Sequence, residues 1–279
     1  MNITIIGLGL IGGSMALLLR GLPGVQRIIG VDHENAHGKQ ALNGGLVDEM
    51  MDLEDAISVC DVIILAIPVD AIKNILPTIL NIVDTQVIMD VGSTKAVICK
   101  TVQDHRNRGL FVASHPMWGT EFSGPSAATK LAFAGKAAVI CDQVNSSHAA
   151  IGIVEKIYKF LGMHIVYMSS EEHDLHAAYV SHVSHITSFA LANTVLEKER
   201  EDNNIFELAS GGFESTVRLA KSHAEMWVPI FVQNRLNVLD VLNEHVEQLN
   251  KFKSCLVNED FEELARLIAH ANTIKRILK

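Results

Sequence analysis

Short runs of β-branched and other apolar residues alternate with stretches of helical periodicity along the first 168 residues of the chain. The apolar runs predict strands at 2–6, 27–31, 62–66, 87–90, 110–114, 136–140 and 164–167. Amphipathic stretches between them predict helices at 14–20, 35–44, 69–80 and 147–161. Strands that alternate with helices are typical of a parallel sheet covered on both faces, so we expect the doubly wound α/β fold class.

The pattern changes after Met168, because the remaining residues contain only stretches of helical periodicity, at 171–197, 204–209, 214–220, 224–253 and 259–277. Ser169 lies shortly before two glutamates and supplies a capping hydroxyl, which is typical of a helix N-terminus. We therefore expect an α/β domain at 1–168 and an all-helical domain at 169–279. Long apolar helices in an all-helical unit of this size indicate a surface that a second subunit covers, so we expect a homodimer through the helical domain.

The composition is that of a globular enzyme, with 48% hydrophobic and 20% charged residues. The formal net charge of −9 disfavours nucleic acid and anionic membrane surfaces as partners. The uncharged segment 3–19 lacks the basic start and the cleavage site of a signal peptide, and glycines interrupt it, so we expect no membrane span. The four cysteines form no metal-binding or CxxC spacing, which predicts free thiols in a cytoplasmic protein.

A glycine-rich turn follows the first predicted strand and opens an apolar helix, which is the context of the dinucleotide-binding GxGxxG fingerprint of the Rossmann fold. In this fingerprint Gly7 permits the tight turn, Gly9 lets the backbone approach the pyrophosphate, and Gly12 lets the helix pack closely against the strand. Together with Leu10 and Ile11, these glycines place the N-terminus of the helix against the phosphates. We therefore predict a Rossmann domain that binds a dinucleotide.

The second predicted strand ends in Asp32, at the position where a carboxylate binds the ribose hydroxyls and repels the 2′-phosphate of NADP. No arginine follows Asp32 directly, which also disfavours NADP. We therefore expect NAD as the cofactor. His33, beside Asp32, leaves open how strictly NADP is excluded.

Two polar loops follow the predicted strands that end at Asp90 and Ser114. The first loop contains Ser93 and Lys95, and the second contains His115. Because ligands of open α/β sheets bind beyond the carboxyl ends of the strands, we expect both loops to face the cofactor. A histidine at this place can accept the proton of a substrate hydroxyl while a hydride leaves the same carbon. His115 is therefore the candidate catalytic base.

Two further clusters lie in the predicted helical domain. At 100° per residue, Asp174, Ser181 and His185 project within about 20° of one line on a helix, and this polar face must meet a ligand, a partner or water. Arg218 follows a pair of glycines and is suited to bidentate capture of a carboxylate, and Trp227 lies further along the chain. These residues are candidates for a substrate site.

Metal binding is the alternative that the 13 histidines suggest, since two pairs, His173 with His176 and His182 with His185, have i, i+3 spacing. No carboxylate or cysteine completes an obvious set of ligands around these pairs, and the HExxH motif is absent from the sequence. We therefore expect no metal site.

The motifs occur in a characteristic order along the chain. The glycine fingerprint, a GSxK turn, HPMxGxExSG, HDxxxAxxSHxxH and a GGF segment followed by an arginine and a tryptophan resemble the prephenate/arogenate dehydrogenase family of tyrosine biosynthesis. The resemblance covers essentially the whole chain. It implies oxidative decarboxylation, in which NAD⁺ takes a hydride from the hydroxyl-bearing ring carbon, CO₂ leaves and the ring becomes aromatic.

The resemblance also implies roles for individual residues. His115 would accept the hydroxyl proton and be held in place by Ser93, and Arg218 would bind the side-chain carboxylate of the substrate. His185 would line the substrate pocket. The residues that occupy pocket or gate positions in the family are matched here by Ser181 and Trp227.

The substrate itself stays open between two compounds. Prephenate carries a keto acid side chain, whereas arogenate carries an amino acid whose ammonium group would benefit from a carboxylate such as Glu121 or Glu214. The sequence most resembles bacterial NAD-linked prephenate enzymes, so prephenate is the expected substrate.

Two other functions fit the sequence less well. Dehydrogenases of the β-hydroxyacid type have a similar layout but use a catalytic lysine on an interdomain helix, and the predicted helix 171–197 has no lysine. A non-catalytic NAD-sensing regulator would have lost its site residues, whereas the candidate residues named above are all present.

Overall fold

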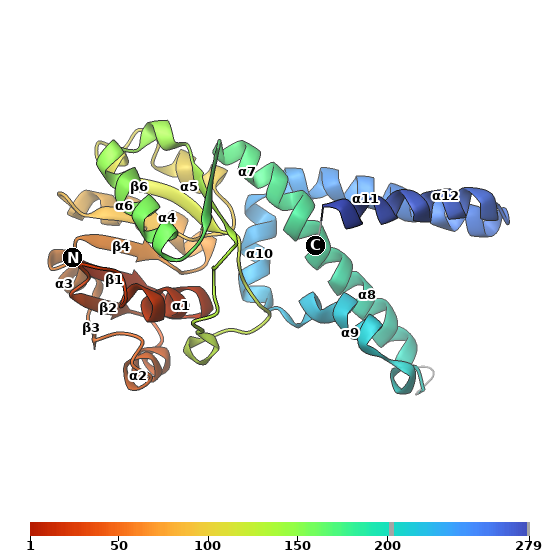
Figure 1. The fold of residues 1–279 in the computed structure, drawn as a ribbon, viewed down its shortest axis with the longest axis horizontal. Coiled ribbons are helices and arrows are strands. Elements are labelled where there is room, and N and C mark those ends of the chain that lie inside the picture. The colour runs from red at the N-terminus through yellow and green to blue at the C-terminus, as the bar shows by residue number, and fades with distance from the viewer. Residues whose placement is uncertain (201–203, 278–279) are drawn as a thin grey trace.

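The computed structural model of the chain describes residues 1–200 and 204–277. Figure 1 shows a sheet with helices on both faces at one end of the molecule, and long helices that extend from it in two arms. Within the described residues the sheet has eight strands in the order β3-β2-β1-β4-β5-β6-β7-β8. These strands are β1 (Asn2–Ile6), β2 (Arg27–Val31), β3 (Glu49–Met50), β4 (Val62–Leu65), β5 (Val87–Asp90), β6 (Phe111–Pro116), β7 (Ala137–Cys141) and β8 (His164–Met168).

Six helices cover the two faces of the sheet. One face carries α1 (Leu10–Leu19), α2 (Asn35–Asn43) and α6 (His148–Phe160). The other carries α3 (Leu53–Ser58), α4 (Val69–Ile82) and α5 (Ala96–Thr101). Successive side chains of a strand point to opposite faces, so Ile3 and Ile5 of β1 are buried in one core and Ile6 in the other. Burial on both faces explains why the strands read as nearly continuous apolar runs.

The doubly wound α/β fold is confirmed, with one departure from a parallel sheet. Neighbouring strands are parallel except β6 and β7, which are antiparallel. Parallel strands are usually joined by a crossover helix, whereas the connection 117–136 contains only the short 3₁₀ turn Pro125–Ala127. Most predicted strand bounds agree with the structure to within one or two residues. The pattern does not predict β3, because two residues are too few to show a periodicity.

The helical part begins with α7 (Ser170–Ala177), directly after β8. The predicted cap is present: the Ser169 hydroxyl accepts the N–H of Glu172, and the Glu172 carboxylate accepts the N–H of Ser169. A π-helical turn, Ala178–His182, then leads into α8 (Val183–Glu199). The single helix predicted at 171–197 is therefore interrupted.

The rest of the described chain is also helical. It contains α9 (Gly211–Val217), α10 (Ala224–Gln233), α11 (Arg235–Val257) and α12 (Phe261–Ala271). The prediction of one helix at 224–253 is wrong, because the chain breaks between α10 and α11 at Asn234. The Asn234 side-chain amide donates to the Asp174 carbonyl oxygen and contacts His182 Nδ1. These tertiary contacts leave no mark on the local pattern.

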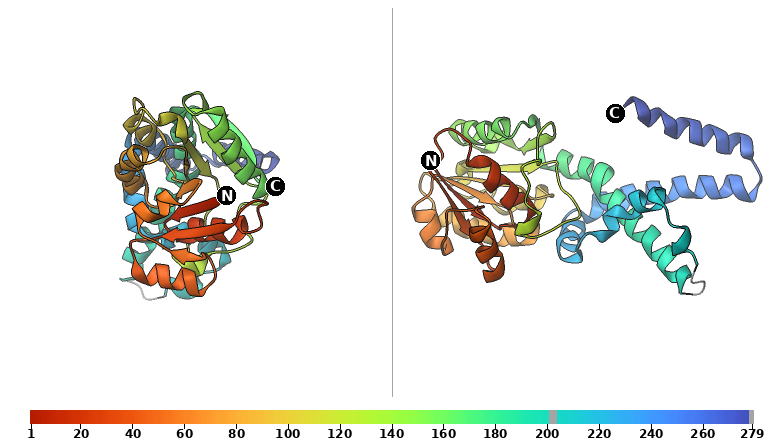
Figure 2. Two further views of the ribbon diagram at one scale, coloured as in Figure 1. Left: turned by 90° about the vertical axis from the view of Figure 1, so that its left-hand side faces the viewer. Right: turned by 60° about the horizontal axis from the view of Figure 1, so that its bottom comes forward.

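The two arms project away from the sheet, as Figures 1 and 2 show: α8 and α9 form one arm, and α11 and α12 form the other. The arm of α11 and α12 exposes several large apolar side chains, among them Leu249, Leu256, Val257, Phe261 and Ile268. None of the helices in the described ranges combines the length and the hydropathy that a membrane crossing requires.

Candidate active site

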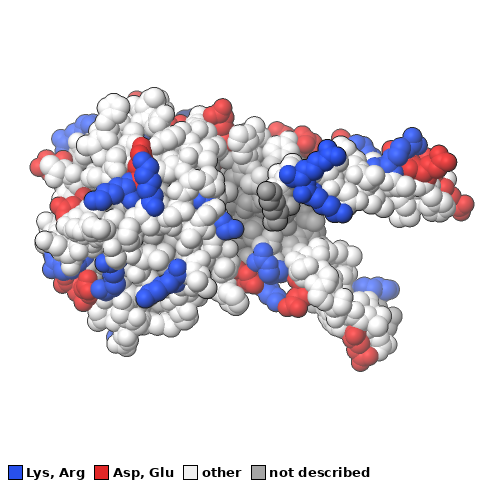
Figure 3. Space-filling model, viewed as in Figure 1, with Lys and Arg blue, Asp and Glu red and all other residues white. Residues whose placement is uncertain are grey.

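A pocket of about 490 Å³ opens where the carboxyl ends of β1, β4, β5 and β6 meet the π turn, α8 and α10. On the face shown in Figure 3, the hollow between the sheet and the two arms is lined mostly by uncharged residues. The carboxyl ends of the strands are the edge at which open α/β sheets bind ligands. The predicted site residues that line the pocket are Leu10, Ile11, Ser93, His115, Ser181, His185, Arg218 and Trp227.

The glycine turn has the geometry that the dinucleotide fingerprint requires. Gly7 has a φ of +92°, and a Cβ there would lie 2.4 Å from the carbonyl oxygen of Ala66. A Cβ on Gly12 would lie 1.9 Å from the carbonyl oxygen of Gly7, so α1 packs closely against the turn. At Gly9, by contrast, no described atom outside the adjoining residues and the nearby helix backbone lies within 4 Å of the Cβ position. This space admits a phosphate to the start of α1, whose first turn carries no acidic residue.

Asp32 is fixed beside this turn, with only 4% of its side chain exposed. Its two carboxylate oxygens accept the N–H groups of Leu8 and Glu34, each at 2.9 Å. The imidazoles of His33 and His37 lie 3.7 and 3.8 Å from Oδ1. The structure therefore adds His37 to the one histidine that the sequence placed next to this carboxylate.

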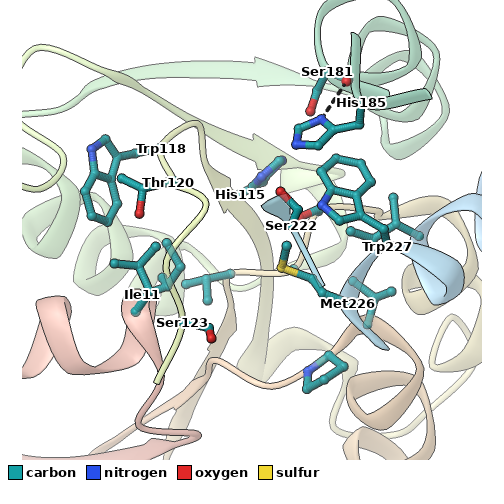
Figure 4. A pocket seen from close by; sticks show the side chains of 18 of the residues that line it. Ile11, His115, Trp118, Thr120, Ser123, Ser181, His185, Ser222, Met226 and Trp227 are labelled. Atoms are coloured by element: carbon teal, nitrogen blue, oxygen red, sulfur yellow. Dashed lines mark hydrogen bonds between the residues drawn. The ribbon is translucent and has the colours of Figure 1, made fainter. Parts of the chain in front are cut away.

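His115 lies at the end of β6 and faces the pocket, as Figure 4 shows. Its Nδ1 is 2.9 Å from Nε2 of His173, and the two rings meet edge to face. Burial lowers the pKa of His115 well below its usual range, and the nearby His173, Lys95 and His182 lower it further. A neutral imidazole in a pocket can accept a proton from a ligand.

His185 and Trp227 form a stacked pair that also lines the pocket, as Figure 4 shows. Their ring centroids are 3.5 Å apart and their planes are inclined by 30°. Nδ1 of His185 donates to the backbone carbonyl of Ser181 at 3.0 Å, so Nε2 is left as an acceptor. Burial and the nearby Arg218 lower the pKa of His185, although its hydrogen bond to Ser181 opposes this shift.

Arg218 reaches across to the loop that follows β6. Its Nη1 lies 2.8 Å from Oε2 of Glu121, and its side chain is 47% exposed. A backbone hydrogen bond and then Arg218 lower the pKa of Glu121, so this carboxylate is ionised. A guanidinium has five N–H donors, and the contact with Glu121 leaves others for a ligand in the pocket.

Two family models match successive parts of the chain. Residues 15–167 match the nucleotide-binding domain of prephenate dehydrogenase, and residues 169–270 match its dimerization domain. The chain belongs to the prephenate dehydrogenase family. The resemblance predicted from the motifs is therefore confirmed.

Individual relatives within this family match the chain over most of its length. It is 31% identical to the prephenate dehydrogenase of Bacillus subtilis, over 95% of this chain and 72% of that protein. It is 29% identical to the cyclohexadienyl dehydrogenase of Zymomonas mobilis, over 100% of this chain and 96% of that protein. Its fold matches that of a prephenate dehydrogenase from A. aeolicus in complex with hydroxyphenyl propionate and NAD⁺, with a TM-score of 0.91, 27% identity, and coverage of 100% and 98%.

The structure of this prephenate dehydrogenase family member gives His115 a different partner from the expected one. The resemblance implied that Ser93 holds His115, and Ser93 does line the pocket. Within the described chain, however, the hydrogen bond of the His115 ring goes to His173. The sequence places His173 in the HDxxxAxxSHxxH motif and in a histidine pair, and neither spacing carries information on contacts between the two parts of the molecule.

A buried ion pair, also missed from the sequence, holds the backbone next to His115. Lys95 and Asp90 form this pair, and both side chains are fully buried. Lys95 Nζ also donates to the carbonyl oxygen of Ser114 at 2.9 Å, and Asp90 accepts the N–H of Ser114 at 3.0 Å. Because Ser114 directly precedes His115, the ion pair fixes the end of β6. The sequence signal for this ion pair was a lysine in a turn of otherwise uncharged residues that follows a buried strand.

The prediction that Asp174 shares a polar face with Ser181 and His185 is wrong. The π turn between them has i→i+5 hydrogen bonds, so it rotates the later side chains away from the positions that 100° per residue predicts. Ser181 and His185 line the pocket, whereas Asp174 is 2% exposed and accepts the backbone N–H groups of Lys95 at 2.7 Å and Ala96 at 2.9 Å. Asp174 thereby joins α7 to the start of α5.

Proposed function

We propose that this chain is an NAD-dependent dehydrogenase that converts prephenate to 4-hydroxyphenylpyruvate by oxidative decarboxylation, a step of tyrosine biosynthesis. The observation that carries the proposal is His115, a neutral imidazole that faces the pocket while His173 engages one of its ring nitrogens. Family membership supports the same reaction, as do the NAD⁺ and hydroxyphenyl propionate named with the A. aeolicus structure.

The residues around the glycine turn fit NAD. The space at Gly9 and the close packing at Gly12 suit a pyrophosphate at the start of α1. Asp32 can accept hydrogen bonds from the ribose hydroxyls and repels a 2′-phosphate. Leu10 and Ile11 line the pocket next to this turn. NAD⁺, when bound there, supplies the acceptor for the hydride.

His115 accepts the proton of the ring hydroxyl as the hydride leaves the same carbon. The bond between the ring and the carboxylate carbon breaks, CO₂ leaves, and the electron pair of that bond makes the ring aromatic. The proton on His115 then returns to the phenolate oxygen, which gives the phenol of the product and restores the neutral imidazole. Because aromatisation makes the step strongly downhill, the protein mainly supplies positioning and a proton acceptor.

Prephenate rather than arogenate is favoured by the carboxylates near the pocket. Glu121 is already paired with Arg218, and Glu214 is 73% exposed and lies 3.7 Å from Lys221. The described residues that line the pocket include no aspartate or glutamate. The ammonium group of arogenate would therefore meet no unpaired carboxylate there, whereas the carboxylates of prephenate can meet Arg218.

Steady-state NADH or NADPH formation tests the proposal with four combinations, prephenate or arogenate with NAD⁺ or NADP⁺. We expect the highest kcat/KM with prephenate and NAD⁺. Absence of turnover in all four combinations would overturn the proposed activity. A higher kcat/KM with arogenate would reassign the substrate, and equal use of NADP⁺ would contradict the role of Asp32.

Arg218→Gln is expected to raise the KM for prephenate by about tenfold to a hundredfold and to leave kcat nearly unchanged, because a charge-assisted hydrogen bond to a carboxylate is lost. Arg266→Gln, which removes an exposed arginine of α12, serves as the control. Glu121→Gln separates the two partners of the ion pair. An equal rise of KM in Glu121→Gln would assign the effect to the ion pair instead of the substrate.

The domain boundary and the oligomeric state belong to the same proposal. Residues 1–168 act as the nucleotide-binding domain and residues 169–279 as the substrate-binding and dimerisation domain. The end of β8 at Met168 supports this boundary. The match of 169–270 to a dimerization domain and the apolar side chains exposed on α11 and α12 support a homodimer.

Sedimentation equilibrium is expected to give twice the 30.5 kDa mass of the chain. The double substitution Leu249→Glu and Leu256→Glu is expected to shift the protein toward the monomer, because both side chains are more than half exposed and seven positions apart on one face of α11. Val144→Glu, at an exposed position outside the arms, is the control. A monomeric wild-type protein would contradict the homodimer.

A further inference from the structure

Three side chains form a continuous hydrogen-bonded row behind the pocket. Nδ1 of His115 lies 2.9 Å from Nε2 of His173, and Nδ1 of His173 lies 2.8 Å from Oδ1 of Asp174. His115 belongs to the sheet, whereas His173 and Asp174 belong to α7. Both α7 residues are 2% exposed, so water does not compete for these hydrogen bonds.

The hydrogen-bond partners of Asp174 determine where the protons of this row lie. Oδ1 accepts the backbone N–H of Lys95, and Oδ2 accepts that of Ala96. A carboxylate that receives these donors is an acceptor, so Nδ1 of His173 carries a hydrogen and donates it. With that hydrogen on Nδ1, Nε2 of His173 presents its lone pair to Nδ1 of His115, which therefore donates. The remaining nitrogen of His115, Nε2, consequently has a lone pair directed away from the row.

We propose that His173 and Asp174 are positioning residues that hold His115 in its Nδ1–H tautomer, with Nε2 ready to accept the substrate's hydroxyl proton. This inference rests on the proposed dehydrogenase function for its catalytic consequence, but the tautomer itself is independent of any substrate. When His115 takes up the proton, it becomes an imidazolium whose Nδ1–H still donates to His173. Asp174 thus sets the orientation of two rings in succession, as the carboxylate of a catalytic triad sets one.

The other groups around the row agree with this assignment. The ammonium of Lys95 is directed to Asp90 and to the Ser114 carbonyl, so it offers no hydrogen to either imidazole. On the helical side, Nδ1 of His182 faces the side-chain amide of Asn234, which also donates to the carbonyl of Asp174. Burial lowers the pKa of His182 to about 4, so at neutral pH His182 is uncharged and adds no positive charge near the row.

The tautomer of His115 can be observed directly. In protein with ¹⁵N-labelled histidine, two-bond ¹H–¹⁵N correlation spectra near pH 7.5 distinguish a protonated from an unprotonated ring nitrogen, and His115→Asn identifies the signals of His115. We expect a protonated Nδ1 and an unprotonated Nε2 in the absence of any ligand. The opposite tautomer in the wild-type protein would overturn the proposal, whether or not the protein oxidises prephenate.

Substitutions at His173 test the catalytic consequence. His173→Phe keeps a flat ring but removes the acceptor, and it is expected to lower kcat on the order of 10²-fold with little change in the KM for prephenate or the Kd for NAD⁺. His173→Gln restores a carbonyl oxygen that can accept from His115, so it should recover at least about tenfold of the loss. His176→Gln, at an exposed position of the same helix, is the matched control.

These outcomes separate positioning from a merely structural role. A kcat of His173→Phe within about threefold of the wild-type value would overturn the proposal, as would equal kcat values for the Phe and Gln variants. If His173→Phe does not fold, the spectra of the wild-type protein and the His173→Gln variant still decide. If the wild-type protein has no activity with prephenate but His115 has the expected tautomer, the proposed function fails and the positioning inference stands.

Discussion

His115→Asn is expected to lower kcat by at least about 10²-fold and to leave the affinity for NAD nearly unchanged. The effect is large because the hydroxyl proton then lacks its acceptor at the moment the hydride leaves. The KM for prephenate should change little, since Arg218 and His185 remain in the pocket wall. Stopped-flow NADH formation under saturating substrate measures kcat, and calorimetric titration with NAD⁺ measures the affinity for NAD. A kcat near the wild-type value would remove His115 from the mechanism.

The pH dependence of the wild-type enzyme follows from the same residue. His115 must be neutral to accept a proton, and burial lowers its pKa well below the usual range. The acidic limb of kcat/KM should therefore fall below pH 6.5, with activity retained as the pH is lowered through 6.5 and lost only further down. The Asn variant should lack this limb.

Gly12→Ala is expected to destabilise the protein by about 1–3 kcal/mol and to weaken NAD binding by at least about tenfold. A Cβ at this position would lie 1.9 Å from the carbonyl oxygen of Gly7, and a backbone atom cannot rotate away as a side chain can. The glycine turn and α1 must therefore separate, which costs packing and displaces the phosphate site. Thermal unfolding without ligand and titration with NAD⁺ measure the two effects.

Two other glycines provide controls for this prediction. Gly9→Ala should leave the unliganded protein as stable as the wild type, because nothing described lies near its Cβ position, yet should still weaken NAD binding. Gly152→Ala, in α6 and with no described atom beyond its own helix near the Cβ position, should change neither binding nor stability adversely. If Gly12→Ala unfolds at the wild-type temperature, the proposed close packing does not constrain this position.

The fold and the cofactor turn were the parts that the sequence predicted best. Buried parallel strands require apolar residues on both faces, so the local sequence shows where they lie without knowledge of the elements that pack against them. The fingerprint is local as well: Gly7 and Gly12 are required by atoms within the same strand–turn–helix unit or the adjacent strand. The resemblance to a known family then added the order of reactive motifs, which periodicity alone does not interpret.

The supports of the site could not be predicted, because they depend on contacts between distant segments. His173 meets His115 only after α7 packs against α5 and β7, and the sequence separation of 58 residues hides the pair. The π turn adds a rotation that no regular helical period includes, so Asp174 lies on a different face from Ser181 and His185. The break at Asn234 likewise follows from hydrogen bonds to α7 and the π turn.

The carboxylate of Asp174 has a consequence for how the molecule behaves as a whole. It belongs to α7, yet it accepts hydrogen bonds from the backbone N–H groups of Lys95 and Ala96 at the start of α5. It also holds the ring of His173, which in turn orients His115. Undocking of the helices from the sheet breaks the bonds of Asp174 to Lys95 and Ala96 together with the bond between His173 and His115. The alignment of His115 therefore depends on the docking of the helices. If proteolysis or incomplete folding removes the helical part, the nucleotide-binding part loses this alignment and the substrate pocket together. Such a fragment could still hold a dinucleotide without oxidising anything.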